Sequence, residues 1–118
     1  MINPLNPTTE YIAARGVWVV KTAIDFDLVD YPKFTVPVGF ESDGASVPRF
    51  LWSLMPPISS YTQAAFGHDY LYKEHDPMRD RKQADKFFRD AMVFLGVGLL
   101  KRNTMYRAVR LFGRGAWK

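Results

Sequence analysis

The chain has 118 residues, of which 47% are hydrophobic and 15% aromatic, enough apolar material for one packed domain. It contains no cysteine, which excludes disulfides, zinc–thiolate sites and cysteine nucleophiles. The charge is unevenly distributed, because residues 1–98 hold ten basic and twelve acidic side chains whereas residues 99–118 hold six basic side chains and no acid. We therefore predict a single domain over 1–118 with a basic C-terminal helix or tail at 99–118.

We expect neither a signal peptide nor a transmembrane segment. The first seven residues lack the basic start and apolar core of a signal sequence. The longest apolar run, 91–100, is about half the length that spans a bilayer, and it is typical of a core helix. The absence of cysteine fits folding in a reducing compartment.

Residues 16–40 are predicted to form a small antiparallel sheet. The stretch 17–20 is β-branched and aromatic, and 24–28 alternates apolar with acidic side chains, the period-two pattern of a half-buried strand. An Asp-Tyr-Pro turn precedes a partner strand at 34–36. Pro37 cannot donate a ladder hydrogen bond, so this strand is expected to be short or to lie at an edge.

The second half of the chain is predicted to be helical. Residues 41–58 are expected to form a long loop, a feature that in a compact domain is often functional. Two or three helices follow, at about 60–74, 80–95 and 99–112, with Asp-Pro ending the first and recurring apolar positions giving the second one buried face. The predicted fold class is α+β, with the short helix connections favouring antiparallel packing.

A group of polar side chains on the first two helices is the candidate site. His68 and Tyr72 lie one turn apart and share a face, and Asp69 points about a quarter turn away. Asp85 on the second helix comes near His68 if the helices are antiparallel. A neutral imidazole is a good general base near neutral pH, and a carboxylate on its far nitrogen fixes the tautomer. His75 lies about 10 Å further along the helix, too far to share a metal ion with His68, and is predicted to be a helix-end residue.

This segment resembles a known active site. The sequence Gln-Ala-Ala-Phe-Gly-His-Asp-Tyr-Leu-Tyr at 63–72, followed by Gln-Ala-Asp-Lys-Phe-Phe at 83–88, is similar to the active-site helices of phospholipase A-two enzymes. The likeness is strongest to the cysteine-free domain of parvovirus capsid proteins, and it covers residues 63–92, about a quarter of the chain.

The resemblance implies a role for each member of the group. His68 would be the base that activates water, Asp85 its orienting partner, Asp69 a calcium carboxylate and Tyr72 a support. It thereby implies a calcium-dependent lipid esterase. The family's glycine-rich calcium loop just before the first helix has no clear counterpart, and the comparable loop here is 43–46.

A second resemblance spans about residues 16–113. It links the chain to a family of small uncharacterised phage and prophage proteins, which implies a phage origin and suggests that the loop at 43–49 and the helix at 68–72 belong to one site. The residues that carry it are Phe40, Asp43, Gly44, Ala45, Ser46, Val47, Pro48, Arg49, Trp52, His68, Asp69, Tyr70, Leu71, Tyr72, Arg81, Ala84, Asp85, Phe88 and Met92.

The loop residues keep two interpretations each. Asp43 and Gly44 fit either a metal-binding loop or a plain turn. Ser46 lies in no Gly-x-Ser-x-Gly elbow and fits a turn or cap. Arg49 suits an anion or an ion pair, and Trp52 suits the core or a lid.

Two classes of function remain open. The first is a metal-assisted ester hydrolase acting on lipid, with His68, Asp85 and Tyr72 catalytic and calcium as the expected cofactor; it requires His68 to face a cleft. The second is a non-enzymatic virion component, such as a tail or baseplate protein, in which these residues are structural. Expected partners are other virion proteins or, through the basic tail, an anionic membrane surface, with nucleic acid less favoured. We expect synthesis in the bacterial host cytoplasm and incorporation into the virion.

Overall fold

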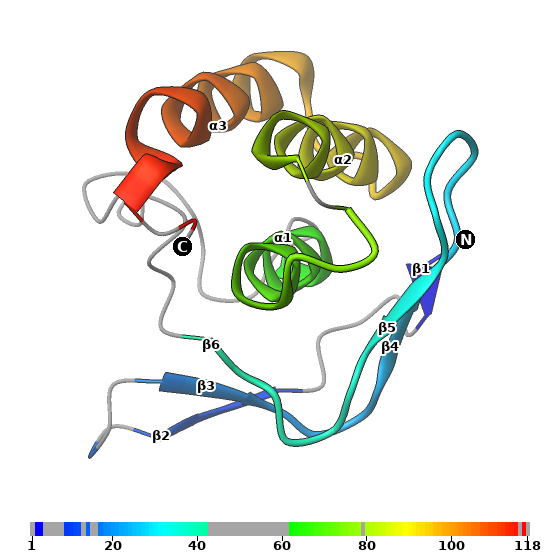
Figure 1. The fold of residues 1–118 in the computed structure, drawn as a ribbon, viewed down its shortest axis with the longest axis vertical. Coiled ribbons are helices and arrows are strands. Elements are labelled where there is room, and N and C mark those ends of the chain that lie inside the picture. Colours follow the sequence, from blue (N-terminus) through cyan, green and yellow to red (C-terminus); the bar gives the residue numbers. More distant parts are fainter. Residues whose placement is uncertain are drawn as a thin grey trace.

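The computed structural model describes residues 2–3, 9–12, 14, 17–42, 62–78, 80–115 and 117. These residues form two antiparallel sheets of three strands each, followed by three helices, so the predicted α+β class is confirmed (Figure 1). The elements in chain order are β1 (Ile2–Asn3), β2 (Thr9–Ile12), β3 (Val17–Val20), β4 (Ile24–Phe26), β5 (Phe34–Val36), β6 (Glu41–Ser42), α1 (Thr62–Glu74), α2 (Arg81–Phe94), α3 (Leu99–Phe112) and the short 3₁₀ helix η2 (Gly113–Gly115).

The first sheet has the order β1-β4-β5, with β4 in the centre. Ile24 and Phe26 are buried while Asp25 between them is exposed, which confirms the predicted alternation. Asp25 pairs with Thr35 across the strands and accepts a hydrogen bond from its hydroxyl at 2.7 Å. Strand β5 lies at the sheet edge and ends just before Pro37, as its missing amide requires.

The second sheet has the order β2-β3-β6 and differs from expectation. Glu41 and Ser42, predicted as loop, form β6 because they pair with Val19 and Trp18 of β3. Strands β1 and β2 were not predicted, and a single sheet over 16–40 is wrong: β3 belongs to one sheet and β4 and β5 to the other.

The three helices match their predicted ranges closely. Asp80 caps α2 by accepting a hydrogen bond from the Lys82 amide at 2.8 Å. Gly96 lies in the four-residue connection 95–98 between α2 and α3 and has a φ of +82°, a conformation that glycine adopts without strain. Helix α1 lies in the middle of the molecule, packed against α2 on one side and β4, β5 and β6 on the other (Figure 1). Within the described ranges, no helix is both long and apolar enough to cross a bilayer.

The core is filled where α1 meets the first sheet. The Phe26 ring stacks on Phe34 with centroids 4.9 Å apart and meets Phe87 of α2 edge-on at 5.4 Å. Gly67 of α1 lies directly over Phe26, and a Cβ added at Gly67 would stand 2.7 Å from the ring. This close approach sets how deeply α1 sits, and so where its polar residues lie.

Candidate functional site

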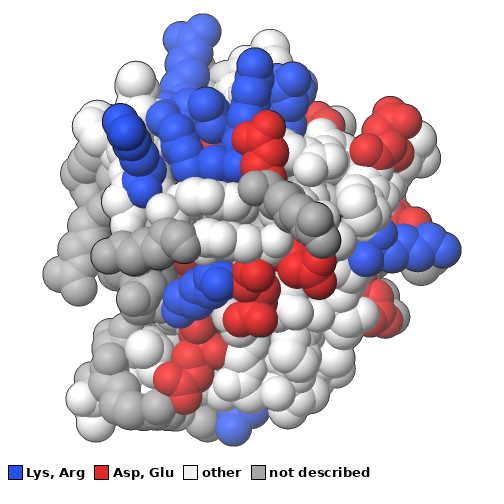
Figure 2. All heavy atoms as spheres, viewed as in Figure 1, with Lys and Arg blue, Asp and Glu red and all other residues white. Residues whose placement is uncertain are grey.

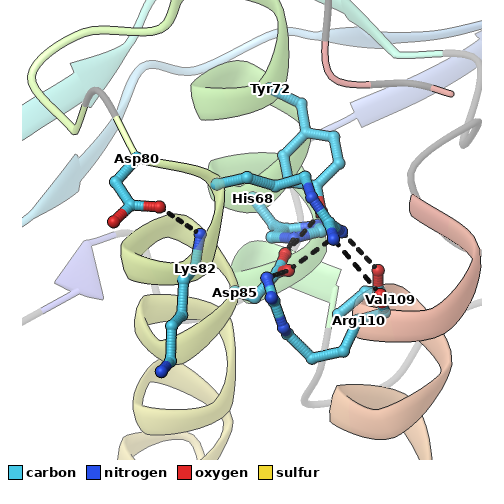
Figure 3. A network of polar contacts seen from close by, with 8 residues as sticks. His68, Tyr72, Asp80, Lys82, Asp85, Val109 and Arg110 are labelled. Carbon is cyan, nitrogen blue, oxygen red and sulfur yellow. Dashed lines mark hydrogen bonds and ion pairs between the residues drawn. The ribbon is translucent and has the colours of Figure 1, made fainter. Parts of the chain in front are cut away.

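Helices α1 and α2 place three of the predicted residues in contact. His68 Nε2 lies 2.6 Å from Asp85 Oδ1, and the Tyr72 hydroxyl donates to the same oxygen at 2.5 Å (Figure 3). All three side chains are buried. The expected contact between His68 and the far helix is therefore present, and Tyr72 joins it through the shared carboxylate.

The other oxygen of Asp85 is held by arginines that the sequence analysis did not assign to the site. Arg110 of α3 donates to Oδ2 at 2.8 Å, and Arg81, one turn before Asp85, approaches it at 3.4 Å. In the sequence, Arg81 was one of the residues that carry the second family resemblance, but no role was predicted for it. Arg110 was predicted only as part of the basic tail. Asp85 is thus the centre of a network that joins all three helices (Figure 3).

The network favours the ionised form of this buried carboxyl. Burial alone raises the pKa of Asp85, but the hydrogen bond and charge of His68, with the hydrogen bonds of Tyr72 and Arg110, lower the pKa below its ordinary value. Burial and the bond to Asp85 raise the pKa of Tyr72, against the smaller opposing effect of Arg81. The pair is therefore a tyrosine hydroxyl donating to a carboxylate.

The C-terminal end of α3 closes over this network. Arg81 donates to the carbonyls of Val109 and Arg110 at 3.0 and 3.2 Å. Gly113 packs so tightly on the Tyr72 hydroxyl that a Cβ would stand 2.7 Å from it. The site is therefore built partly by residues that follow the predicted helix pair.

Trp117 continues the cover beyond Gly113. Its ring meets Tyr72 edge-on at 5.3 Å and stacks on His75 at 4.0 Å. His75 ends α1 with a φ of +55°, and its amide donates to the Leu71 carbonyl at 2.9 Å, so its prediction as a helix-end residue is confirmed.

Asp69 faces away from this network. Its carboxylate is buried and accepts a hydrogen bond from the Ser42 hydroxyl of β6. Lys73, one turn further along α1, donates to the Glu41 carbonyl at 2.9 Å and so fastens the helix to the same strand. The part of the chain that the structure describes contains no group of three or more His, Cys, Asp or Glu side chains able to hold a metal ion.

The remaining predicted site residues lie outside the described residues. These are Asp43, Gly44, Ser46, Arg49 and Trp52. The chain enters their segment directly after Ser42, which contacts Asp69.

His68 differs from one expectation of the hydrolase hypothesis. That hypothesis requires His68 to face a cleft, whereas 0% of the side chain is exposed. Its ring is stacked on Phe88 at 4.5 Å and tilted against Tyr72 at 4.3 Å. In this conformation the imidazole belongs to the interior of the domain.

Together these features define an α+β domain whose helices enclose a buried histidine–aspartate–tyrosine network. The chain belongs to the family described as "Protein of unknown function (DUF1353)", whose model matches residues 18–109. The matched range begins in β3 and ends in α3, and so includes the whole network except Arg110.

One relative is the "Uncharacterized protein y4jT" of Sinorhizobium fredii (strain NBRC 101917 / NGR234). It is 31% identical over 111 residues, which cover 91% of this chain and 32% of the relative. The chain thus spans about a third of that protein's length. No solved structure matches the chain.

Proposed function

We propose that this protein, of phage or prophage origin, hydrolyses a lipid ester, with His68 as the general base that activates water. One observation carries the proposal: Asp85 receives both His68 and Tyr72 on one carboxylate oxygen, across the two helices whose sequence resembles the phospholipase active site. A histidine whose far nitrogen is held by an ionised carboxylate is a recurring arrangement in hydrolases.

The network determines which histidine nitrogen can act. Because Asp85 is held ionised by its donors, it accepts a hydrogen from His68 Nε2, and the nitrogen proposed as the base is therefore Nδ1. Nδ1 takes a proton from water as the water oxygen attacks the ester carbonyl, and Asp85 stabilises the imidazolium that forms. The tetrahedral intermediate then breaks its bond to the alcohol oxygen, which takes that proton from Nδ1, so that the products are a carboxylic acid and an alcohol. Tyr72 supports the carboxylate without leaving its neutral form.

Calcium is part of the proposal through Asp69. Calcium prefers six to eight oxygen ligands. Among the described residues, the buried Asp69 carboxylate and the Ser42 hydroxyl that bonds it supply oxygen at one place, and the predicted loop of Asp43 and Gly44 follows Ser42 directly in the chain. A bound calcium would polarise the ester carbonyl.

The burial of His68 adds a requirement. Water and an ester can reach Nδ1 only after neighbouring groups move, because no part of the side chain meets solvent. The proposed reaction therefore includes an opening step before catalysis, as in enzymes gated by a mobile element.

The test is hydrolysis of a phospholipid thioester, with the released thiol followed colorimetrically. The chain has no cysteine, so the protein adds no background to this assay. We expect His68→Gln to lower kcat/KM by about 10²–10⁴, the usual contribution of a general base. The matched control is His75→Gln, which changes the only other histidine of the sequence. Its kcat/KM should stay within about twofold of the wild-type value, because His75 is not the proposed general base. Equal turnover by wild type and His68→Gln, or none by wild type, refutes the proposal. Unchanged turnover in a calcium chelator would remove only the calcium part.

A second candidate is a virion component in which the network is structural. It is favoured by the complete burial of His68 and Asp85 and by the four donors that surround one carboxylate. This candidate predicts no turnover in the thioester assay and recovery of the protein with purified particles of its phage.

A further inference from the structure

Helix α3 turns a face of leucine and arginine toward solvent. Leu100 and Leu111 are 83% and 73% exposed, and Arg107 is exposed between them. The spacings of seven and four residues place all three on one line along the helix. The opposite face buries Met105 and Val109 in the core. Large aliphatic side chains held this far out of the core gain stability only if something covers them.

The charges beside this line are all positive. Lys101 and Arg114 are exposed with Arg107, and within the described part of the chain none of the three forms an ion pair. No acidic residue occurs after Asp90. Figure 2 shows Lys and Arg side chains gathered over α2 and α3 on the face in view. The exposed face of α3 thus combines apolar side chains with basic side chains that form no ion pair among the described residues.

We infer that α3 binds the surface of an anionic lipid bilayer, with Leu100 and Leu111 entering the acyl boundary and Arg107 lying among the headgroup phosphates. An amphipathic helix with leucine anchors and basic flanks suits this surface. Nucleic acid would use the basic groups but leave the leucines in water. A second copy of the chain would bring arginine against arginine on the paired faces.

The inference does not depend on ester hydrolysis. The same helix presents Arg110 to Asp85 on its inner side and Arg107 and Leu111 to solvent. A lipid-bound α3 would therefore hold the buried network close to the membrane. Binding is still a separate property, because none of the outward side chains touches His68 in the described contacts.

The test is flotation of the full chain with vesicles of ether-linked phosphatidylglycerol and phosphatidylcholine, which no esterase can cleave. We expect binding to the anionic vesicles, and at least about tenfold weaker binding to pure phosphatidylcholine. Leu100→Ser with Leu111→Ser should weaken binding by at least about tenfold, since each loses the burial of a leucine. Arg107→Gln should weaken it by about fivefold, the effect of one basic residue near an anionic surface.

Matched controls lie on the sheet side of the molecule. Val29→Ser with Val38→Ser removes two apolar side chains that are 86% and 62% exposed, and Lys33→Gln removes one exposed charge. None of these should change binding, and His68→Gln should bind as wild type does even if the hydrolase proposal fails.

Several results would overturn the inference. These are no binding to anionic vesicles, binding that survives both leucine changes, and effects of the control variants equal to those on α3. Displacement from vesicles by duplex DNA, with tight DNA binding that ignores the leucines, would assign the face to nucleic acid instead. Dimerisation that the leucine changes abolish would assign it to a second copy.

Discussion

Replacing Asp85 by asparagine removes the negative charge at the point where the three helices meet. Removing one partner of a buried ion pair costs about 3–5 kcal/mol when the remaining charge is fully buried. Here 19% of the Arg81 side chain and 30% of the Arg110 side chain are exposed to solvent, so water partly solvates the charges that lose their partner. We therefore expect Asp85→Asn to lower the free energy of unfolding by about 2–4 kcal/mol at pH 7. Since the free energy of unfolding of native domains is about 5–15 kcal/mol, the variant should remain folded.

Urea unfolding followed by tryptophan fluorescence measures this loss. With a slope of about 1.5 kcal/mol per molar, a loss of 3 kcal/mol moves the midpoint down by about 2 M. The control is Asp25→Asn on the exposed face of β4. This side chain lies in solvent, so its substitution should shift the unfolding free energy by less than about 0.5 kcal/mol.

The loss should also depend on pH in a defined direction. The pKa of Asp85 is lower in the folded protein than its ordinary value of 3.8. Its stabilising effect is therefore complete above about pH 4 and disappears as the pH falls through the lower folded-state pKa. The difference between wild type and Asp85→Asn should narrow below pH 4, because protonated aspartate resembles asparagine. A loss under about 1 kcal/mol at pH 7, or a gap that stays constant into acid, would refute the role we assign to this carboxylate.

Two further predictions test the framework around the site. Gly67→Ala should destabilise the protein by about 1–2 kcal/mol in the same urea assay, because the new methyl meets the enclosed Phe26 ring and the helix propensity of alanine only partly offsets the clash. Gly115→Ala, at an exposed position where the added Cβ would meet nothing within 4 Å, is the control, and equal effects at both positions would contradict the packing argument. Asp80→Ala should lower the free energy of unfolding by about 1 kcal/mol, because it removes the cap on the Lys82 amide. Asp80→Ser should retain most of the capping stabilisation. An alanine variant as stable as wild type would show that the cap contributes nothing.

The helices could be predicted because each carries its own local signals. An Asp-Pro pair follows α1, an aspartate precedes α2 in the capping position, and Gly96 ends the apolar pattern of α2 where the backbone adopts a positive φ. These effects act within a few residues. The contact between Asp85 and His68 was predicted from antiparallel packing of these two helices and from the resemblance to the phospholipase active site.

The strands β1 and β6 could not be predicted, because each has two residues and depends on a partner distant in the sequence. Strand β2, which pairs with the neighbouring β3, was also missed. Glu41 and Ser42 have no strand pattern of their own and pair only because β3 offers an edge. Arg110 was missed for a related reason: in the sequence it is one of six basic residues in a tail, and only the packing of α3 on α2 brings it to Asp85.

The two oxygens of Asp85 explain why stability alone does not decide between the candidate functions. One oxygen accepts from His68 and Tyr72, the other from the arginines, so an asparagine must turn its amide group toward one pair or the other. If the asparagine NH₂ group faces the arginines, donor groups oppose one another there, but the amide oxygen still accepts a hydrogen bond from His68 Nε2. If the NH₂ group faces His68, it donates to Nε2, so the ring hydrogen must move to Nδ1, and it also lies against the tyrosine hydroxyl that donated to Asp85. Both orientations lose stability, but only the second changes which nitrogen carries the proton. Turnover by His68→Gln therefore separates a catalytic network from a structural one, whereas an unfolding curve of Asp85→Asn measures what both have in common.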